Sequence, residues 1–317
     1  MDKIPLVVVA GPTASGKTAL SIEIAKRYNG EVISADSMQI YKHMDIGTAK
    51  PTEEEKAGIP HHMIDIAEPY ENFSVALYVK MARQRIEDVY ARKKLPVMAG
   101  GTGLYIDNVL QNIKLAQTNA DTETREKLTA LVEKNGNDYM YGLLKKEDPK
   151  AAENIHPNNI RRVIRALEVC YTSGSTFSSQ IENSKLEESP YKSICFMPEW
   201  DRNTLYSRID ARVDMMFEAG LYDEFEKLIH AGCKRTMTSM QAIGYRELID
   251  CYRGLCSIDE AKELIKRHSR RYAKRQLTWF KRNDEIIHLK APFDNMIKQC
   301  FERLGRFFAS DMLTDKK

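Results

Sequence analysis

The sequence lacks the features that mark several specialised classes of protein. Its six cysteines form no Cys-x-x-Cys pair, so neither a zinc ribbon nor a thioredoxin-like redox pair is indicated. Single scattered cysteines are typical of a reducing compartment, where the thiol packs as a small apolar group. No stretch approaches the roughly 20 apolar residues that a membrane-spanning helix requires, and the first apolar run is too short for a signal peptide. We therefore expect a cytoplasmic protein that makes no membrane contact.

A strong net charge is also missing. The formal net charge of +3 says little about a nucleic-acid partner. The distribution of charge is more informative, because residues 262–282 hold nine Lys or Arg and a single acid, Glu263. A helix of this composition is either a solvated face beside an apolar stripe or a surface that contacts a phosphate backbone. The near absence of acids favours the second interpretation.

Near its N-terminus the chain carries a phosphate-binding loop pattern, G-x-x-x-x-G-K-[ST]. An apolar run at residues 4–10 precedes the loop and an amphipathic segment at residues 17–28 follows it. A strand, a glycine-rich loop and a helix N-terminus together form an anion site, in which backbone N–H groups point at phosphate oxygens. Lys17 adds a positive charge, and the Thr18 hydroxyl is a candidate ligand for Mg²⁺. The eight residues of the loop are Gly11, Pro12, Thr13, Ala14, Ser15, Gly16, Lys17 and Thr18.

Short apolar runs alternate with amphipathic segments in the rest of this region. Residues 31–35 and 95–99 resemble buried strands, and residues 74–94 form a helical pattern between them. This alternation is typical of a parallel, doubly wound sheet, whose ligands lie beyond the carboxyl ends of the strands. The predicted fold class is α/β, with a P-loop parallel sheet core flanked by helices. Further elements are expected at residues 104–110, 191–198, 202–217, 241–252, 258–281 and 284–289.

The length of 317 residues predicts about two domains. Residues 114–190 are polar and mostly helical by pattern, so we expect an inserted all-helical domain there, with residues 1–113 and 191–317 forming the core. Within the insertion, residues 173–189 are rich in serine and are predicted to be a flexible loop. The tail from about residue 311 is predicted to be disordered.

Two residues that follow predicted strands are candidates for chemistry. Asp36 could act as a metal ligand or a general base, or it could simply cap a turn. Thr102 lies in a second glycine-rich turn, where the backbone could approach a ligand or merely turn from strand to helix. The adjacent His61 and His62 would point to opposite faces of a strand, so we expect structural roles for both.

Basic residues also cluster outside residues 262–282. Arg161, Arg162 and Arg165 form one patch in the predicted insertion. Arg208 and Arg212 form another, because residues four apart lie one helical turn from each other. Such patches are candidates for contact with phosphates.

Together these segments resemble one family, the tRNA dimethylallyltransferases, also called tRNA isopentenyltransferases. The resemblance extends from near residue 4 to about residue 283. The matching elements are GPTASGKT at 11–18, SADSMQIYKHMDIGTAKPT at 34–52, HHMID at 61–65, FSVALY at 73–78, GGTGLYI at 100–106, HPNNIRRVIRALEV at 156–169, RIDARVDMMFEAGL at 208–221, QAIGYRE at 241–247 and AKRQLTWFKR at 273–282.

The resemblance implies a reaction and its partners. A dimethylallyl group would move from its diphosphate to the exocyclic N6 amine of the adenosine 3′-adjacent to the anticodon, in tRNAs that read codons beginning with U. The implied partners are dimethylallyl diphosphate and the anticodon stem-loop of tRNA, with Mg²⁺ as the cofactor and a monomer as the acting species. Because no Cys/His pattern follows residue 283, the chain resembles the bacterial form, without the zinc finger of some eukaryotic members.

The resemblance also implies roles for individual residues. The loop at 11–18 would bind the diphosphate, with Lys17 as a catalytic residue and Thr18 as the metal ligand. Asp36 would take a proton from the attacking amine, and Thr102 would contact the leaving-group side of the donor. Arg212, or alternatively Arg208, would help to hold the diphosphate. The expected tRNA contacts are Asp36, Ser37, Met38, Gln39, Arg161, Arg162, Gly244, Tyr245, Arg246, Lys274 and Arg275.

Two alternatives remain open from the residues themselves. A small-molecule kinase would use the same loop for ATP, although the strand at 95–99 ends without the acid expected to hold a metal. An RNA-binding protein could instead use the loop for a regulatory nucleotide.

Overall fold

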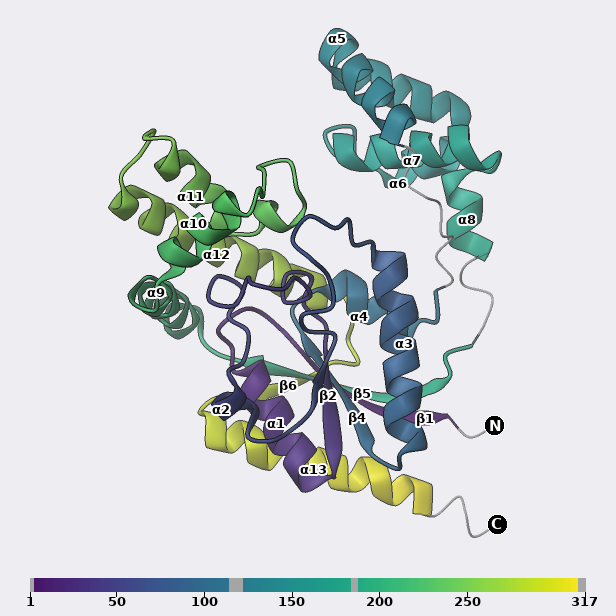
Figure 1. The fold of residues 1–317 in the computed structure, drawn as a ribbon. Helices are drawn as coiled ribbons and strands as arrows, with labels where there is room; N and C mark the ends of the chain where they lie inside the picture. Colours follow the sequence, from purple (N-terminus) through teal and green to yellow (C-terminus); the bar gives the residue numbers. More distant parts are fainter. Residues whose placement is uncertain (1–2, 114–121, 184–187, 313–317) are drawn as a thin grey trace. The chain divides into compact units, whose positions relative to one another are not determined.

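Six parallel strands form the sheet at the centre of the larger of two units (Figure 1). The computed structural model describes residues 3–113, 122–183 and 188–312. The larger unit comprises Met1–Leu110 and Pro190–Lys317, and the smaller comprises Gln111–Ser189. The strands, in the sheet order β3-β2-β4-β1-β5-β6, are β1 (Ile4–Ala10), β2 (Gly30–Ser34), β3 (His61–His62), β4 (Leu95–Gly100), β5 (Tyr191–Glu199) and β6 (Ile287–Lys290).

Helices cover both faces of this sheet, because alternate side chains of a strand point to opposite faces. On one face, Val7 and Val9 of β1 pack with Leu20 of α1 and Met296 of α13. Helices α1 and α13 lie side by side below the sheet in Figure 1. On the other face, α3 contacts β2 and β4, and α4 packs beside α3. The bounds of these helices are α1 (Lys17–Arg27), α3 (Val75–Ala91), α4 (Gly103–Leu110) and α13 (Phe293–Met312), and a short helix, α2 (Glu53–Lys56), follows β2.

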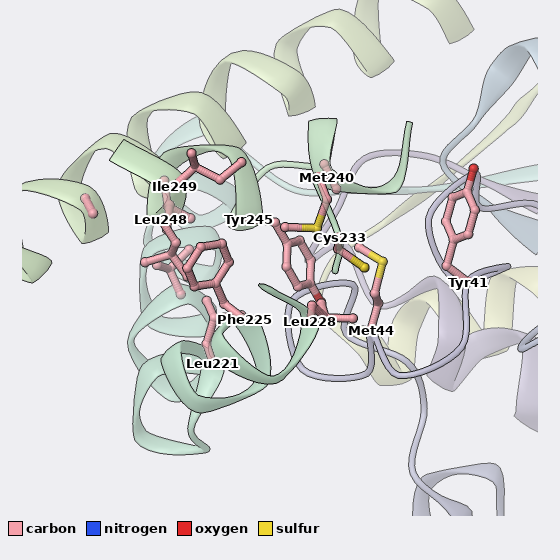
Figure 2. Close-up of a cluster of buried hydrophobic side chains, with 14 of the residues drawn as sticks. Tyr41, Met44, Leu221, Phe225, Leu228, Cys233, Met240, Tyr245, Leu248 and Ile249 are labelled. Carbon is pink, nitrogen blue, oxygen red and sulfur yellow. The ribbon is translucent and has the colours of Figure 1, made fainter. Parts of the chain in front are cut away.

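A second hydrophobic cluster joins the segment after β2 to helices from much later in the chain (Figure 2). Tyr41 and Met44 come from the first, and Phe225 and Tyr245 come from α10 and α11. All four of these side chains have no solvent exposure. The helices of this region are α9 (Arg202–Glu218), α10 (Leu221–His230), α11 (Tyr245–Tyr252) and α12 (Ile258–Phe280), with one 3₁₀ turn at Ser239–Gln241.

The smaller unit is helical throughout its described secondary structure. Its helices are α5 (Thr122–Glu147), α6 (Pro149–Asn154), α7 (Ile160–Ser173) and α8 (Phe177–Asn183). Gly136, at φ 80°, interrupts α5. Met140 and Leu144 of α5 pack with Val163 and Leu167 of α7, which gives this unit a hydrophobic core of its own.

Most predicted elements coincide with observed ones, and the differences have local causes. Residues 173–189 are not one flexible loop, because α8 forms within them and Ser178 donates to the Asp148 carboxylate from its backbone (2.8 Å) and its hydroxyl (2.7 Å). The predicted helix at 241–252 is broken at Gly244, whose φ of 105° lies in the left-handed region. Residues 184–187 of the predicted loop lie outside the described residues.

Four elements of the larger unit have no counterpart among the predictions, namely the short α2 and β3, and the helices α10 and α13. Helix α13 ends at Met312, and the rest of the tail predicted to be disordered, residues 313–317, lies outside the described residues. No helix formed by the described residues is long and apolar enough to span a bilayer.

One buried carboxylate organises the edge of the sheet. Glu31 of β2 is 1% exposed and accepts hydrogen bonds from Arg92 Nη1 (2.5 Å), Arg92 Nη2 (2.6 Å) and Lys94 Nζ (2.8 Å). His62 Nε2 lies 2.7 Å from the same carboxylate, which gives this histidine the structural role that we expected. The hydrogen bonds from Arg92 hold the pKa of Glu31 well below its usual value. Burial has the opposite effect on this pKa, but it is the smaller of the two.

We expect Glu31→Gln to lower the free energy of unfolding at pH 7 by about 3 kcal/mol, because Arg92 and Lys94 lose their buried partner. A carboxylate with a depressed pKa stabilises the fold above its unfolded-state pKa of about 4.3, and this contribution is lost as pH falls toward the folded-state pKa. Urea unfolding at pH 7 and at successively lower pH should therefore show the difference from wild type shrinking. The exposed Glu54→Gln serves as the control. An equal loss for Glu31→Gln at every pH would contradict this account.

Candidate functional site

A cavity of about 310 Å³ opens where β1, β2 and β4 end. Its walls come from the phosphate-binding loop, residues 36–39, residues 47–49, the end of β4, α9, residues 241–244 with Arg246, and α12. Because the strands are parallel, their carboxyl ends meet at the same edge of the sheet. The fold therefore gathers segments from most of the larger unit around one space.

Side chains from outside the phosphate-binding loop fix the loop's backbone. The Trp200 indole donates to the carbonyl of Ser15 (2.9 Å), and Arg208 Nε donates to the carbonyl of Ala14 (2.9 Å). The Arg208 guanidinium also lies 4.5 Å from the centre of the Trp200 ring. Arg208 therefore contacts the backbone of the loop and the Trp200 ring, while Arg212 lines the cavity.

Two cations, Lys17 and Arg212, meet inside this cavity. Burial, with a further contribution from Arg212, lowers the pKa of Lys17 to about 7, against the opposing effect of Asp36. Burial also lowers the pKa of Arg212. Lys17 Nζ donates to the Pro12 carbonyl (2.6 Å), and Arg212 Nη2 donates to the Ala49 carbonyl (3.4 Å). A bound anion would relieve the repulsion between the two cations and offset the cost of their burial.

The Asp36 carboxylate caps a turn and still faces the cavity. Its Oδ1 accepts from the backbone N–H of Met38 (2.8 Å) and, at longer range, from that of Gln39 (3.4 Å). No described residue donates to the other oxygen, Oδ2, and Asp36 lines the cavity. Asp36 can therefore cap the turn and take part in chemistry at the same time, because Oδ1 serves the cap and Oδ2 is available in the cavity.

Thr102 holds the neighbouring turn in place. Its hydroxyl accepts from the backbone N–H of Ser37 (3.1 Å), and its own N–H donates to the carbonyl of Ala35 (3.1 Å). Thr102 does not line the cavity, whereas Tyr272 of α12 does. Burial, followed by the Asp36 carboxylate, raises the pKa of Tyr272 to about 12, so its phenol stays protonated near neutral pH.

Helix α12 ties the two glycine-rich turns together through Gln276, which is 5% exposed. Its Oε1 accepts from the Thr13 N–H (3.0 Å) and its Nε2 donates to the Gly101 carbonyl (2.9 Å). A Cβ on Gly101 would lie 2.1 Å from Gln276 Nε2, so a larger residue there would displace the Gln276 amide. Sequence reasoning missed Gln276 and Tyr272. For Gln276 the sequence did hold a signal, because it places an uncharged amide among the apolar residues of a basic helix.

The residues expected to contact tRNA fall into different environments. Ser37, Met38, Gly244, Arg246 and Arg275 line the cavity. Lys274 is exposed and lines a neighbouring hollow of about 350 Å³ beside Pro12. Arg161 and Arg162 are exposed on α7 of the smaller unit.

Two of these residues have partners inside the protein. The side chain of Tyr245 is fully buried and its hydroxyl donates to Glu224 (2.6 Å), so this side chain has no surface to offer to RNA. Gln39 lines the cavity, but its amide is occupied, accepting from Ser34 Oγ (3.0 Å) and donating to the carbonyls of Thr48 (3.3 Å) and Ala49 (3.1 Å). Both residues thus hold neighbouring protein segments, and the tRNA contacts expected of residues 36–39 and 244–246 stay predictions.

Metal ligands are sparse in this region. Among the described residues, no three His, Cys, Asp or Glu side chains lie close enough to hold a metal ion. The exposed Thr18 lines the cavity beside Asp36, as the loop pattern predicts. Mg²⁺ that is bound mainly through substrate phosphates and water needs few protein ligands, so this arrangement fits such an ion.

Comparisons with known proteins agree on one family. A model of the IPP transferase family matches residues 39–283. The chain is 49% identical over 296 residues to the tRNA dimethylallyltransferase of Acetivibrio thermocellus, covering 93% of this chain and 94% of the relative. It is 50% identical over 284 residues to that of Bacillus licheniformis, covering 90% of each. The chain belongs to the tRNA dimethylallyltransferase family.

Solved structures support the same assignment. The full-length tRNA isopentenylpyrophosphate transferase of Bacillus halodurans matches with a TM-score of 0.75 and 43% identity, over 99% of this chain and 100% of that one. A eukaryotic dimethylallyltransferase, solved in a study of its action on tRNA, matches with a TM-score of 0.83 and 30% identity, over 97% and 80%. These findings confirm the family and the α/β fold inferred from the motifs. The family-model match begins after the phosphate-binding loop and Asp36, so the roles of those residues are argued from geometry.

The depressed pKa of Lys17 predicts how anion binding depends on pH. A neutral lysine must take up a proton when an anion binds, so affinity should fall as pH rises through about 7. We expect the affinity for inorganic diphosphate, relative to that of Lys17→Met, to fall about fivefold between pH 7 and pH 8. Isothermal titration calorimetry measures both proteins, and the ionisation of diphosphate itself cancels in the ratio. A ratio that stays constant across this range would contradict the prediction.

Proposed function

We propose that this protein transfers a dimethylallyl group from dimethylallyl diphosphate to the N6 amine of the adenosine 3′-adjacent to the anticodon, in tRNAs that read codons beginning with U. One observation carries the proposal, because a single cavity holds a phosphate-binding loop, two half-buried cations and a carboxylate oxygen that has no partner among the described residues. This combination suits a reaction that releases diphosphate and takes a proton from a weakly basic amine.

The transfer breaks one bond and forms another. The bond between C1 of the dimethylallyl group and its diphosphate oxygen breaks, and a bond forms between C1 and N6. The amine proton passes to Asp36 Oδ2, while Oδ1 keeps its hydrogen bond to the Met38 N–H. Negative charge that develops on the departing diphosphate is stabilised by Lys17, Arg212 and the backbone N–H groups of the loop. Mg²⁺ held by Thr18 and the diphosphate oxygens would add further positive charge there.

The adenine must leave its stack to reach this cavity. Arg246 and Arg275 line the cavity, and exposed Lys274 extends the basic surface of α12. We assign this surface to the anticodon stem-loop. We assign the helical unit, with Arg161 and Arg162 exposed on α7, to a further tRNA contact. Since one chain supplies every wall of the cavity, we propose a monomer acting on tRNA in the cytoplasm.

A kinase is the alternative function for such a loop. The end of β4, Ala99-Gly100-Gly101, offers no carboxylate to hold a nucleotide-bound metal. The deciding experiment incubates the protein with labelled dimethylallyl diphosphate, ATP and unmodified tRNA. We expect label in the tRNA and no ATP consumption. Consumption of ATP without labelled tRNA would overturn the proposal.

Removing the proposed base should stop transfer without releasing tRNA. Asp36→Asn keeps the oxygen that caps the turn but cannot take up the amine proton, so we expect kcat to fall by about 100-fold or more. Filter binding should show an unchanged dissociation constant for tRNA. The exposed Asp294→Asn on α13 is the control. A variant that keeps more than about a tenth of the activity would remove Asp36 from this role.

A charge reversal on α12 should weaken tRNA binding in a salt-dependent way. We expect Lys274→Glu to lower the affinity for tRNA. The slope of log affinity against log salt concentration should become shallower by about one, which corresponds to one lost phosphate contact. Lys298→Glu, a reversal at an exposed site on α13, is the matched control. If Lys274→Glu matched wild type across the salt titration, that face of α12 would be assigned to solvent.

A further inference from the structure

One wall of the cavity is a segment without regular secondary structure. Gly47, Thr48 and Ala49 line the cavity, yet residues 45–49 belong to neither a helix nor a strand. The shape of this wall therefore depends on hydrogen bonds from other segments. Gln39 supplies them on one side, by donating to the carbonyls of Thr48 and Ala49.

Glu224 of α10 supplies them on the other side. Its Oε2 accepts from the backbone N–H groups of Asp45 and Ile46, both at 2.8 Å, and its Oε1 accepts from that of Gly47 at 3.0 Å. The Tyr245 hydroxyl donates to the same Oε1 at 2.6 Å. A carboxylate offers about four acceptor sites, so this one side chain is fully used, and three of its four donors come from consecutive residues of the cavity wall.

The second hydrophobic cluster holds Tyr245, the partner of Glu224, in place. Tyr245 is fully buried among Met44, Phe225 and Met240 (Figure 2). Its ring lies against Gly47, where an added Cβ would come within 2.5 Å of the ring. Only glycine fits there, so ring and carboxylate together set the position of residue 47.

The segment that Glu224 holds also contacts one of the two cations in the cavity. The Ala49 carbonyl accepts from Arg212 Nη2 (3.4 Å) as well as from Gln39 (3.1 Å). Arg212 is one of the two cations of the anion site. Glu224 does not line the cavity, so its influence on a ligand must pass through the wall.

We infer that Glu224 is a positioning residue for the transfer reaction, acting through residues 45–49 to orient the Arg212 guanidinium toward the diphosphate. The inference rests on the proposed function, because it needs a diphosphate at Arg212. Tyr245 completes the device by holding Glu224 Oε1.

The test is the affinity for inorganic diphosphate. Glu224→Gln replaces one acceptor oxygen with an NH₂ group that opposes the backbone N–H groups, so the wall should shift. We expect diphosphate affinity to fall about tenfold, and the KM for the prenyl donor to rise similarly, as for loss of a charge-assisted contact. The dissociation constant for tRNA should not change. Glu226→Gln, two residues along α10 and on another face, is the matched control.

A double-mutant cycle separates positioning from general support. In an Arg212→Ala background, Glu224→Gln should cause little further loss of diphosphate affinity, because its effect passes through the missing guanidinium. Tyr245→Phe should produce a smaller loss in the same direction and keeps the test usable if Glu224→Gln fails to fold. Additive losses, an unchanged diphosphate affinity, or a parallel loss of tRNA affinity would each overturn the inference.

Calorimetry needs no turnover, so the two proposals can fail separately. If wild type transfers the prenyl group and Glu224→Gln binds diphosphate normally, only the positioning role is lost. If no transfer occurs but the cycle is non-additive, the positioning of Arg212 stands and the proposed reaction is lost.

Discussion

The parallel arrangement of β1, β2 and β4 is the constraint on which the rest of the site depends. Because all three strands run the same way, the phosphate-binding loop, Asp36 and the glycine-rich turn after β4 leave the sheet at one edge. An antiparallel neighbour would have sent one of these groups to the opposite edge. The anion site and the carboxylate therefore face the same cavity as a consequence of topology.

Two half-buried cations and a fixed backbone give this edge its electrostatic character. Lys17 and Arg212 are held where water cannot fully solvate them, which lowers the pKa of each and makes an anionic ligand favourable. Helix α12 contributes on two sides, since Gln276 links the two glycine-rich turns while Lys274 remains exposed. One helix thus connects the proposed RNA-binding surface to the geometry of the anion site.

Local patterns predicted much of the fold and part of the site. The phosphate-binding loop could be found because its residue types and spacing lie within one strand–loop–helix unit. Asp36 could be found because it directly follows the next predicted strand. Glu224 and Gln276 could not, because their partners lie 177 and 263 residues away in the sequence. The burial of Tyr245 could not be predicted either, since its motif does not reveal that its ring packs against Gly47. Likewise, α8 forms where composition alone predicted a loop, because Ser178 finds a buried carboxylate.

The most direct test of the central claim is a crystal structure with an unreactive thiolo analogue of dimethylallyl diphosphate and an anticodon stem-loop. Our account predicts that the diphosphate contacts Lys17 and Arg212. It also predicts that the adenine is extruded, with its N6 within roughly 2.6–3.2 Å of Asp36 Oδ2. A diphosphate bound elsewhere, or an Asp36 carboxylate turned away from the base, would contradict it.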